Sequence, residues 1–143
     1  MGPTLHLDMT ERWLIETGMD ADFARDVAVN DACFDIVLPG GLSPINALRH
    51  LGPTARLWAR RYLASAERTG SARDLGYGLH CLQDALSHGV LGMAHMRKRA
   101  RMLKRDPDDW DSAPLRLKRA LERETKRVAR LYLAARGCGG HTA

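Results

Sequence analysis

Two histidines and an aspartate recur at four-residue intervals near the middle of the chain. They are His80, Asp84 and His88. Positions four apart on an α-helix differ in direction by only about 40°, so these three side chains share one face of a helix. Imidazole nitrogens and carboxylate oxygens bind zinc, and they also suit iron or manganese. The spacing therefore predicts a metal site that is partly formed before any metal binds.

Leucines on the neighbouring face of the same segment predict that this helix is held against the core. They are Leu75, Leu79, Leu82 and Leu86. The histidines and the aspartate then border the core, where the loss of hydration requires hydrogen-bond partners or a metal. A hydrogen-bonded core histidine without a metal is the alternative interpretation. Cys81 projects about 100° away from His80, so we expect it to pack in the core and not to bind metal.

Three ligands on one helix leave a metal incompletely coordinated, so we expect others from elsewhere in the chain. The candidates are His6, His50, His95, Asp31 and Asp35. A solvated or structural role is the alternative for each of these histidines. For Asp31 a capping or surface role is the favoured interpretation.

Turn and capping residues divide the chain into about six to seven helices, and no alternating strand pattern is present. We therefore expect an all-α fold with a single domain over residues 1–143. Thr10 or Asp8 is expected to cap the first helix, which Gly18 ends, and Asp20 to cap the second. The middle of the chain is expected to contain, in order, a break at 38–41, a short helix from Ser43-Pro44, a break at Gly52-Pro53 and a helix over 54–69 that Gly70 ends.

Ser71 and Asp74 resemble a capping box, with Asp in place of the usual Glu, at the start of the helix that carries His80. The remaining elements are expected to be a basic helix over 93–104, a turn at 106–109, a last helix from about Pro114 to Arg136 that Gly137 ends, and a flexible tail over 137–143. The last helix is expected to bury an apolar stripe made by Leu121, Val128, Leu131 and Ala135.

Composition limits the class of protein. Of the 143 residues, 45% are hydrophobic and 27% are charged, which is typical of a globular domain. The formal charge of +5 favours anionic partners such as phosphates. The three cysteines form no disulfide pattern, and no signal-type leader or run of about 20 apolar residues is present, so we expect a cytoplasmic protein without a transmembrane segment.

The central motif carries a resemblance to a known family. The segment Gly78-x-His80-x-x-Gln83-Asp84-x-x-Ser87-His88-Gly89 resembles a signature of the zinc-dependent phospholipase C-like superfamily, which includes the fungal single-strand-specific nucleases. The order of the flanking residues agrees: a histidine before the first helix, an aspartate late in the second and a histidine before the central motif are matched by His6, Asp35 (or Asp31 one turn earlier) and His50.

The resemblance implies a helical phospholipase C-like fold and zinc-dependent hydrolysis of phosphodiesters. Carried over by position, one zinc would be held by His50, His80, Asp84 and Asp35. Asp84 could bridge to a second metal near His6, and His88 with His95 would belong to another. Members of the family use the amino group of an N-terminal Trp as a ligand, whereas this chain begins Met1-Gly2-Pro3. We therefore expect one or two zinc ions, with iron or manganese as alternatives.

Three functions remain open from the sequence. The first is a hydrolase that acts on a phosphoester or similar anionic small molecule through a metal-activated water, with Asp35 or Asp31 as general base and Arg49 or Arg97 in contact with the substrate. The second is a non-hydrolytic metal enzyme that modifies a small metabolite. The third is a non-catalytic module that binds nucleic acid or an acidic membrane face through the basic segment 97–105, although that segment contains no aromatic residue for base stacking.

Overall fold

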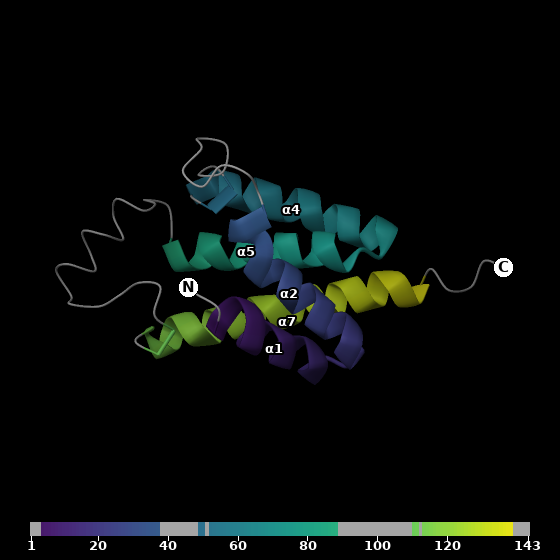
Figure 1. The fold of residues 1–143 in the computed structure, drawn as a ribbon, viewed down its shortest axis with the longest axis horizontal. Helices are drawn as coiled ribbons and strands as arrows, with labels where there is room; N and C mark the ends of the chain where they lie inside the picture. Colours follow the sequence, from purple (N-terminus) through teal and green to yellow (C-terminus); the bar gives the residue numbers. More distant parts are fainter. Residues whose placement is uncertain (1–3, 38–48, 51, 89–109, 112, 139–143) are drawn as a thin grey trace.

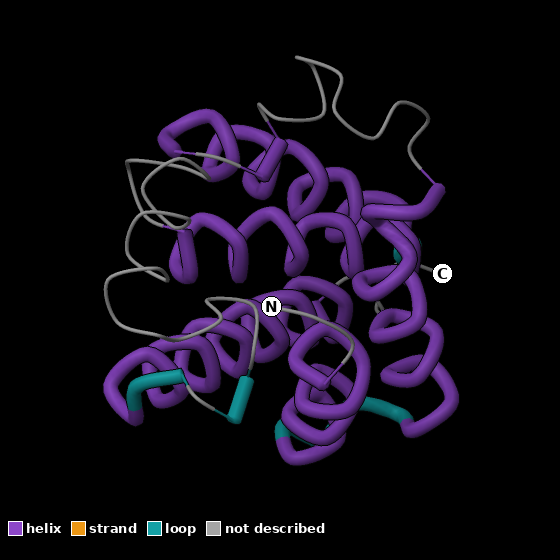
Figure 2. Tube along the Cα trace, turned by 60° about the vertical axis from the view of Figure 1, so that its left-hand side comes forward, coloured by secondary structure: helices purple, strands orange, loops and turns teal. Residues whose placement is uncertain are grey.

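The computed structural model describes residues 4–37, 49–50, 52–88, 110–111 and 113–138, without the side chains of residues 35–37, 52, 88 and 138. All regular structure in these residues is helical, which confirms the all-α prediction (Figure 2). The elements are the π-helix η1 (Thr4–Met9) and the α-helices α1 (Thr10–Glu16), α2 (Ala21–Val37), α4 (Gly52–Thr69), α5 (Ala72–His88) and α7 (Leu115–Cys138). Among them, no helix combines the length and the apolar composition needed to cross a bilayer.

Helix α5 occupies the centre of the bundle. It contacts α2, α4 and α7, and Figure 1 shows α4 and α7 along its two sides with α2 crossing them. Two glycines permit this close packing. A Cβ atom on Gly76 would lie 2.5 Å from the Val27 carbonyl oxygen, and one on Gly78 would lie 2.6 Å from a methyl carbon of Leu63. The sequence of α5 therefore lets α2 and α4 approach its backbone directly.

A tight turn joins α4 to α5 and makes them antiparallel. Gly70 adopts a φ of +74°, which glycine reaches without steric strain, and its N–H donates to the Ala66 carbonyl at 2.8 Å. The Ser71 hydroxyl then accepts the Asp74 N–H at 3.2 Å, which confirms the Ser71 half of the expected capping box, while the Ser71 N–H donates to the Thr69 hydroxyl at 3.3 Å and not to Asp74. The carboxylate of Asp74 accepts the hydroxyl of Ser65 at 2.6 Å. It thus ties α5 to α4.

The core consists of three groups of buried apolar side chains around α5. The largest includes Leu14, Val27, Leu75, Leu79, Val128 and Tyr132; a second contains Leu5, Trp13, Trp110 and Leu121; a third contains Phe34, Ala59, Tyr77 and Cys81. Leu75 and Leu79 are fully buried, as their spacing predicted, while Leu82 and Leu86 are half-buried.

The start of the chain differs from the expectation. The prediction that Thr10 or Asp8 caps the first helix is wrong, because Met9 is the N-cap residue and makes no side-chain cap. The helical path already begins at Thr4, as a π-helix. The hydroxyl of Thr10 instead points inward, 3.1 Å from the Leu5 carbonyl oxygen. Gly18 ends α1 with a φ of +90°, and Asp20 caps α2 by accepting the Phe23 N–H at 3.0 Å; both of these predictions are confirmed.

Two other helix boundaries were predicted wrongly. Gly52-Pro53 is not a break but the first turn of α4, where the missing N–H of proline would have no helical partner in any case. Gly137 does not end the last helix, which continues to Cys138. Its φ is not positive, unlike that of Gly18 and Gly70. The expected break at 38–41, the helix from Ser43-Pro44, the basic helix 93–104 and the turn 106–109 lie outside the described residues.

The apolar stripe expected on the last helix is only half right. Leu121 and Val128 are buried, but Leu131 is 51% exposed and Ala135 is exposed. The buried face turns instead through Thr125, Ala129 and Tyr132. Tyr132 stacks on Phe23 of α2 with ring centroids 5.8 Å apart, so an aromatic contact decides which face of α7 is buried.

Candidate metal centre

Three of the predicted ligands meet in the interior of the bundle. His6 comes from η1, and His80 and Asp84 come from adjacent turns of α5. Their exposed fractions are 4%, 0% and 4%. Each offers a ligand atom, and these atoms all lie within 4.8 Å of one another, so this buried group could hold a metal ion. The carboxylate of Asp84 lies 3.8 Å from Nε2 of His6 and 3.4 Å from Nε2 of His80.

His50 faces the same carboxylate from the segment that precedes α4. Its Nδ1 lies 2.7 Å from Oδ2 of Asp84 and 3.3 Å from Nε2 of His80. The rings of His50 and His80 meet edge to face, with centroids 5.1 Å apart. Three imidazole nitrogens from distant parts of the chain therefore surround one carboxylate.

Asp31 of α2 lies on the opposite side of the His6 and His80 rings. Its Oδ1 is 2.9 Å from Nδ1 of His6, and its backbone carbonyl oxygen is 2.8 Å from Nδ1 of His80. Oδ1 also lies 3.2 Å from Nδ1 of His80. The two rings stack at 4.3 Å with an interplanar angle of 25°. The interpretation of Asp31 as a capping or surface residue is wrong, because its side chain is fully buried between these histidines.

The contacts of Nδ1 indicate which nitrogen of each ring carries the proton. The oxygens beside Nδ1 of His6 belong to the carboxylate of Asp31 and the side-chain carbonyl of Gln83, and both are acceptors. The backbone carbonyl of Asp31 is likewise an acceptor for Nδ1 of His80. We infer that both rings donate from Nδ1, so that in the neutral imidazoles the lone pair of Nε2 points at Asp84. This is the arrangement that metal-binding histidines commonly show.

Gln83 links this network to α7. It is fully buried, its Oε1 lies 2.9 Å from Nδ1 of His6, and its amide donates to the hydroxyls of Thr10 at 2.9 Å and Thr125 at 3.2 Å. The Thr10 hydroxyl is in turn 3.1 Å from Oδ2 of Asp31. From the sequence, Thr10 was expected only to cap the first helix, Gln83 appeared only as a position of the central motif, and Thr125 had no assigned role. One sign of this network was present in the sequence, because Thr125 is a polar residue within the buried stripe of α7.

Cys81 is not part of the centre. It is fully buried against Phe34, Ala59 and Tyr77, as the direction of its side chain on the helix predicted. Burial raises the pKa of its thiol to about 12, so the group stays protonated near neutral pH. A protonated thiol is a poor metal ligand.

The remaining site candidates are described in part or not at all. Arg49 is half-buried beside His50, and its guanidinium carbon lies 4.7 Å from the centre of the Trp58 ring. The side chains of Asp35 and His88 lie outside the described part of the chain, as do the whole residues His95 and Arg97.

Comparisons of the chain with protein-family models, with curated proteins and with solved structures found no match. The interpretation of the centre therefore rests on its own geometry and donor atoms.

Proposed function

We propose that this protein is a zinc-dependent hydrolase of phosphoesters, whose metal is bound by His6, His50, His80 and Asp84. One observation carries the proposal: Nε2 atoms of the buried His6 and His80 and Nδ1 of the half-buried His50 face a single carboxylate, that of Asp84. A metal-free network of hydrogen bonds between these histidines and Asp84 is the alternative.

Two of the distances between donor atoms fit a small divalent ion, whereas Nδ1 of His50 lies at a hydrogen-bond distance of 2.7 Å from Oδ2 of Asp84, and Nε2 of His6 lies 3.8 Å from Oδ1 of Asp84. With Zn–N and Zn–O bonds of about 2.0–2.1 Å, neighbouring ligand atoms of a tetrahedral zinc lie about 3.3 Å apart. Nε2 of His80 lies 3.3 Å from Nδ1 of His50 and 3.4 Å from Oδ2 of Asp84. The donor set of imidazoles and a carboxylate also suits iron or manganese. The geometry therefore supports a metal site but does not select zinc over these two metals.

The residues around the ligands support a role beyond packing. Asp31 and Gln83 hold the Nδ1 side of the histidines, and such outer contacts fix ring orientation and raise ligand basicity. Because Asp31 is enclosed by His6, His80 and Thr10, we assign it a positioning role in place of the general-base role that the sequence suggested. Asp35 stays the predicted general base.

The chemistry follows from the site and its neighbours. A Zn²⁺ ion held by these residues would supply Lewis acidity, which lowers the pKa of a bound water and offsets the negative charge of a phosphoester. Arg49 precedes the ligand His50 in the sequence. Its guanidinium packs over the ring of Trp58, which orients it. We assign Arg49 to contact the anionic substrate. The resemblance of the central motif to the zinc-dependent phospholipase C-like superfamily supports the same reaction class.

The proposal is tested by hydrolysis of bis(4-nitrophenyl) phosphate. We expect activity that chelation abolishes and that zinc restores, and we expect His80→Ala and Asp84→Asn to lose both activity and zinc. Asp26→Asn is the control, because Asp26 is exposed on α2. Zinc binding without hydrolysis of this ester or of 4-nitrophenyl phosphate would contradict the hydrolase. Iron or manganese in the protein would favour the non-hydrolytic enzyme.

A further inference from the structure

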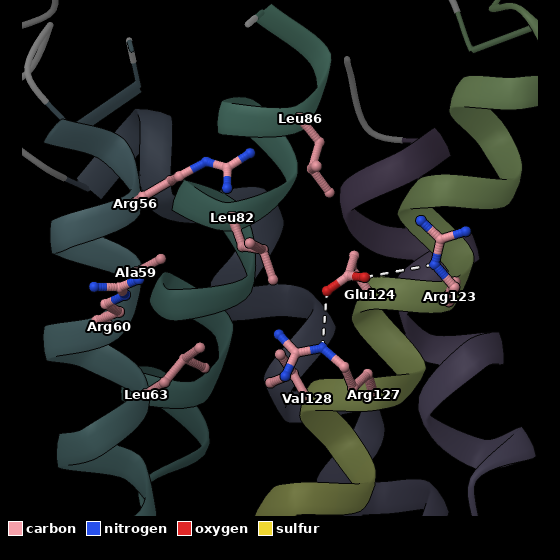
Figure 3. A pocket seen from close by; sticks show the side chains of 10 residues that line it. All are labelled: Arg56, Ala59, Arg60, Leu63, Leu82, Leu86, Arg123, Glu124, Arg127 and Val128. Carbon is pink, nitrogen blue, oxygen red and sulfur yellow. Dashed lines mark hydrogen bonds and ion pairs between the residues drawn. The ribbon is translucent and has the colours of Figure 1, made fainter. Parts of the chain in front are cut away.

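A second candidate site lies on the other side of α5. A partly open cavity of about 320 Å³ lies between α4, α5 and α7 (Figure 3). This volume falls within the range of about 300–1,000 Å³ that is typical of small-molecule sites. Leu82 and Leu86 of α5 line it. They lie about 200° around the helix from His80 and Asp84, so the cavity and the metal centre occupy opposite faces of the same helix.

The interior of this cavity is apolar and its rim is cationic. Leu63 from α4 and Val128 from α7 join the two leucines of α5 in lining it. The rim carries four arginines: Arg56 and Arg60 of α4, and Arg123 and Arg127 of α7 (Figure 3). Cationic groups from two helices therefore stand on either side of an apolar floor.

One carboxylate only partly balances these arginines. Glu124 accepts from Nε of Arg127 at 2.8 Å and lies 3.5 Å from Nε of Arg123. The hydrogen bond from Arg127 holds the pKa of Glu124 below its usual value, so the group is ionised near neutral pH. Arg56 and Arg60 are exposed, and no described residue forms an ion pair with either. Among the described residues that line the cavity, four arginines against one carboxylate leave an excess of three positive charges.

We propose that this cavity binds a single-chain anionic amphiphile, with its alkyl chain on the leucine floor and its carboxylate or phosphate head group between the arginines. An apolar floor offers no hydrogen bond to a sugar or a base, and none of the described residues that line the cavity is an aromatic residue that could stack on a base. The arginines of the rim therefore suit the phosphates of a nucleic acid, but the apolar floor does not suit its sugars and bases. An alkyl chain gains from leaving water, and a planar guanidinium matches carboxylate and phosphate oxygens.

Calorimetric titration of the zinc-loaded full chain tests the proposal. The probes are dodecanoate and dodecyl phosphate below their micellar concentrations, with dodecyltrimethylammonium and inorganic phosphate as controls. We expect saturable one-to-one binding of at least one anionic amphiphile, and at least about tenfold weaker binding of both controls. The relative affinity of the two anionic probes identifies the head group.

Matched variants locate the binding. Arg56→Gln/Arg60→Gln should weaken binding about threefold to tenfold. Arg68→Gln/Arg130→Gln removes the same charge from exposed positions of α4 and α7 outside the cavity and should leave affinity unchanged. Glu124→Gln should strengthen binding severalfold, because it frees Arg123 and Arg127 for the ligand. Equal affinity for the cationic amphiphile, an equal loss in both double variants, or displacement of the amphiphile by a single-stranded oligonucleotide would overturn the proposal. None of these readouts depends on hydrolysis.

Discussion

Asp31 holds two metal-ligand candidates from the same side. Its carboxylate and its backbone carbonyl both face Nδ1 atoms, which leaves Nε2 of His6 and of His80 directed at Asp84. A single buried residue thus sets the orientation of two rings that come from different helices.

Replacement of Asp31 should therefore act on metal affinity. We expect Asp31→Ala to weaken zinc binding about 10–100-fold, because the rings lose their fixed orientation and part of their basicity. Asp26→Ala, an exposed position on the same helix, should bind zinc as the unaltered protein does. Competition with a chromophoric chelator measures both affinities. Equal affinities of Asp31→Ala and Asp26→Ala would refute the positioning role.

Gln83 should contribute to stability as well as to the orientation of His6. Gln83→Leu removes the partner of two buried hydroxyls, those of Thr10 and Thr125. An unsatisfied buried polar group costs about 1–3 kcal/mol, so we expect a loss of that order in the free energy of unfolding. Urea unfolding measures it. Thr125→Val should cost less stability in the Gln83→Leu background than in the unaltered protein, because the partner of Thr125 is already gone. If the two losses in the free energy of unfolding simply add, the two side chains do not interact.

The spacing of histidine and aspartate predicted His80 and Asp84, because a helix face can be read from intervals of four. It did not reveal Asp31, because a single aspartate on a helix gives no sign of burial until α2 packs on α5. Gln83 and Thr10 are neutral polar residues of types that are common on surfaces. Their role exists only in the tertiary hydrogen-bond network.

The packing of α2 on α5 depends on a glycine. A Cβ atom on Gly76 would lie 2.5 Å from the Val27 carbonyl oxygen and 2.8 Å from the Asp31 backbone nitrogen. These are backbone atoms, so the helices themselves would have to separate.

Gly76→Ala should destabilise the protein by about 1–3 kcal/mol, as overpacking of a core does. It should also weaken zinc binding, because the backbone of Asp31 moves. Gly137→Ala is the matched control: a Cβ atom there meets nothing within 4 Å, and the change should stabilise α7 by about 0.5–1 kcal/mol. Thermal unfolding of both variants decides the matter, and a stabilised Gly76→Ala would show that α2 and α5 tolerate separation.

Lys126 of α7 connects to α1 through Glu16, with Nζ and Oε2 2.6 Å apart. The hydrogen bond from Lys126 is the largest cause of the lowered pKa of Glu16. A lowered pKa means that the folded state binds protons less readily than the unfolded state, so this contact stabilises the fold above the ordinary pKa of about 4.5 and is lost as the pH falls below it. We expect Lys126→Met to lower the melting temperature slightly at pH 7 and to match the unaltered protein near pH 3. A difference that does not change with pH would assign the effect to packing.

Capping chemistry predicted several boundaries well and misled at three, one of which is the cap expected from Thr10 or Asp8. Asp20, Ser71 and the positive-φ glycines at 18 and 70 act as their types suggest. Pro53 was read as a break, although proline in a first helical turn is stable. Gly137 was read as a stop, but its φ is not positive and α7 continues to Cys138.

The metal group joins parts of the chain that are far apart in sequence. His6 precedes α1, His50 precedes α4, and His80 and Asp84 lie on α5. An ion that binds them only in the folded state stabilises that state by about 2.7 kcal/mol at 100 times its dissociation constant. We expect zinc to raise the melting temperature of the unaltered protein and chelation to reverse the change. His80→Ala should show no zinc-dependent shift, and a shift of the same size in that variant would place the ion elsewhere.

The overall architecture was the part that the sequence predicted best. Helical periodicity and frequent helix stops require only local information, and they predicted the all-α fold. The convergence of η1, α2, the segment before α4 and α5 on one point depends on long-range packing, which no local pattern encodes. The sequence could therefore name His6 and His50 as candidates but could not choose them over other polar residues.

The most direct test is elemental analysis of the full chain, purified without a metal-affinity tag or chelator, beside His80→Ala and Asp84→Asn. Our account predicts about one zinc per chain in the unaltered protein and none in either variant. A folded, unaltered protein that retains no metal after incubation with zinc would contradict the account, and the buried histidines would then be a structural hydrogen-bond network.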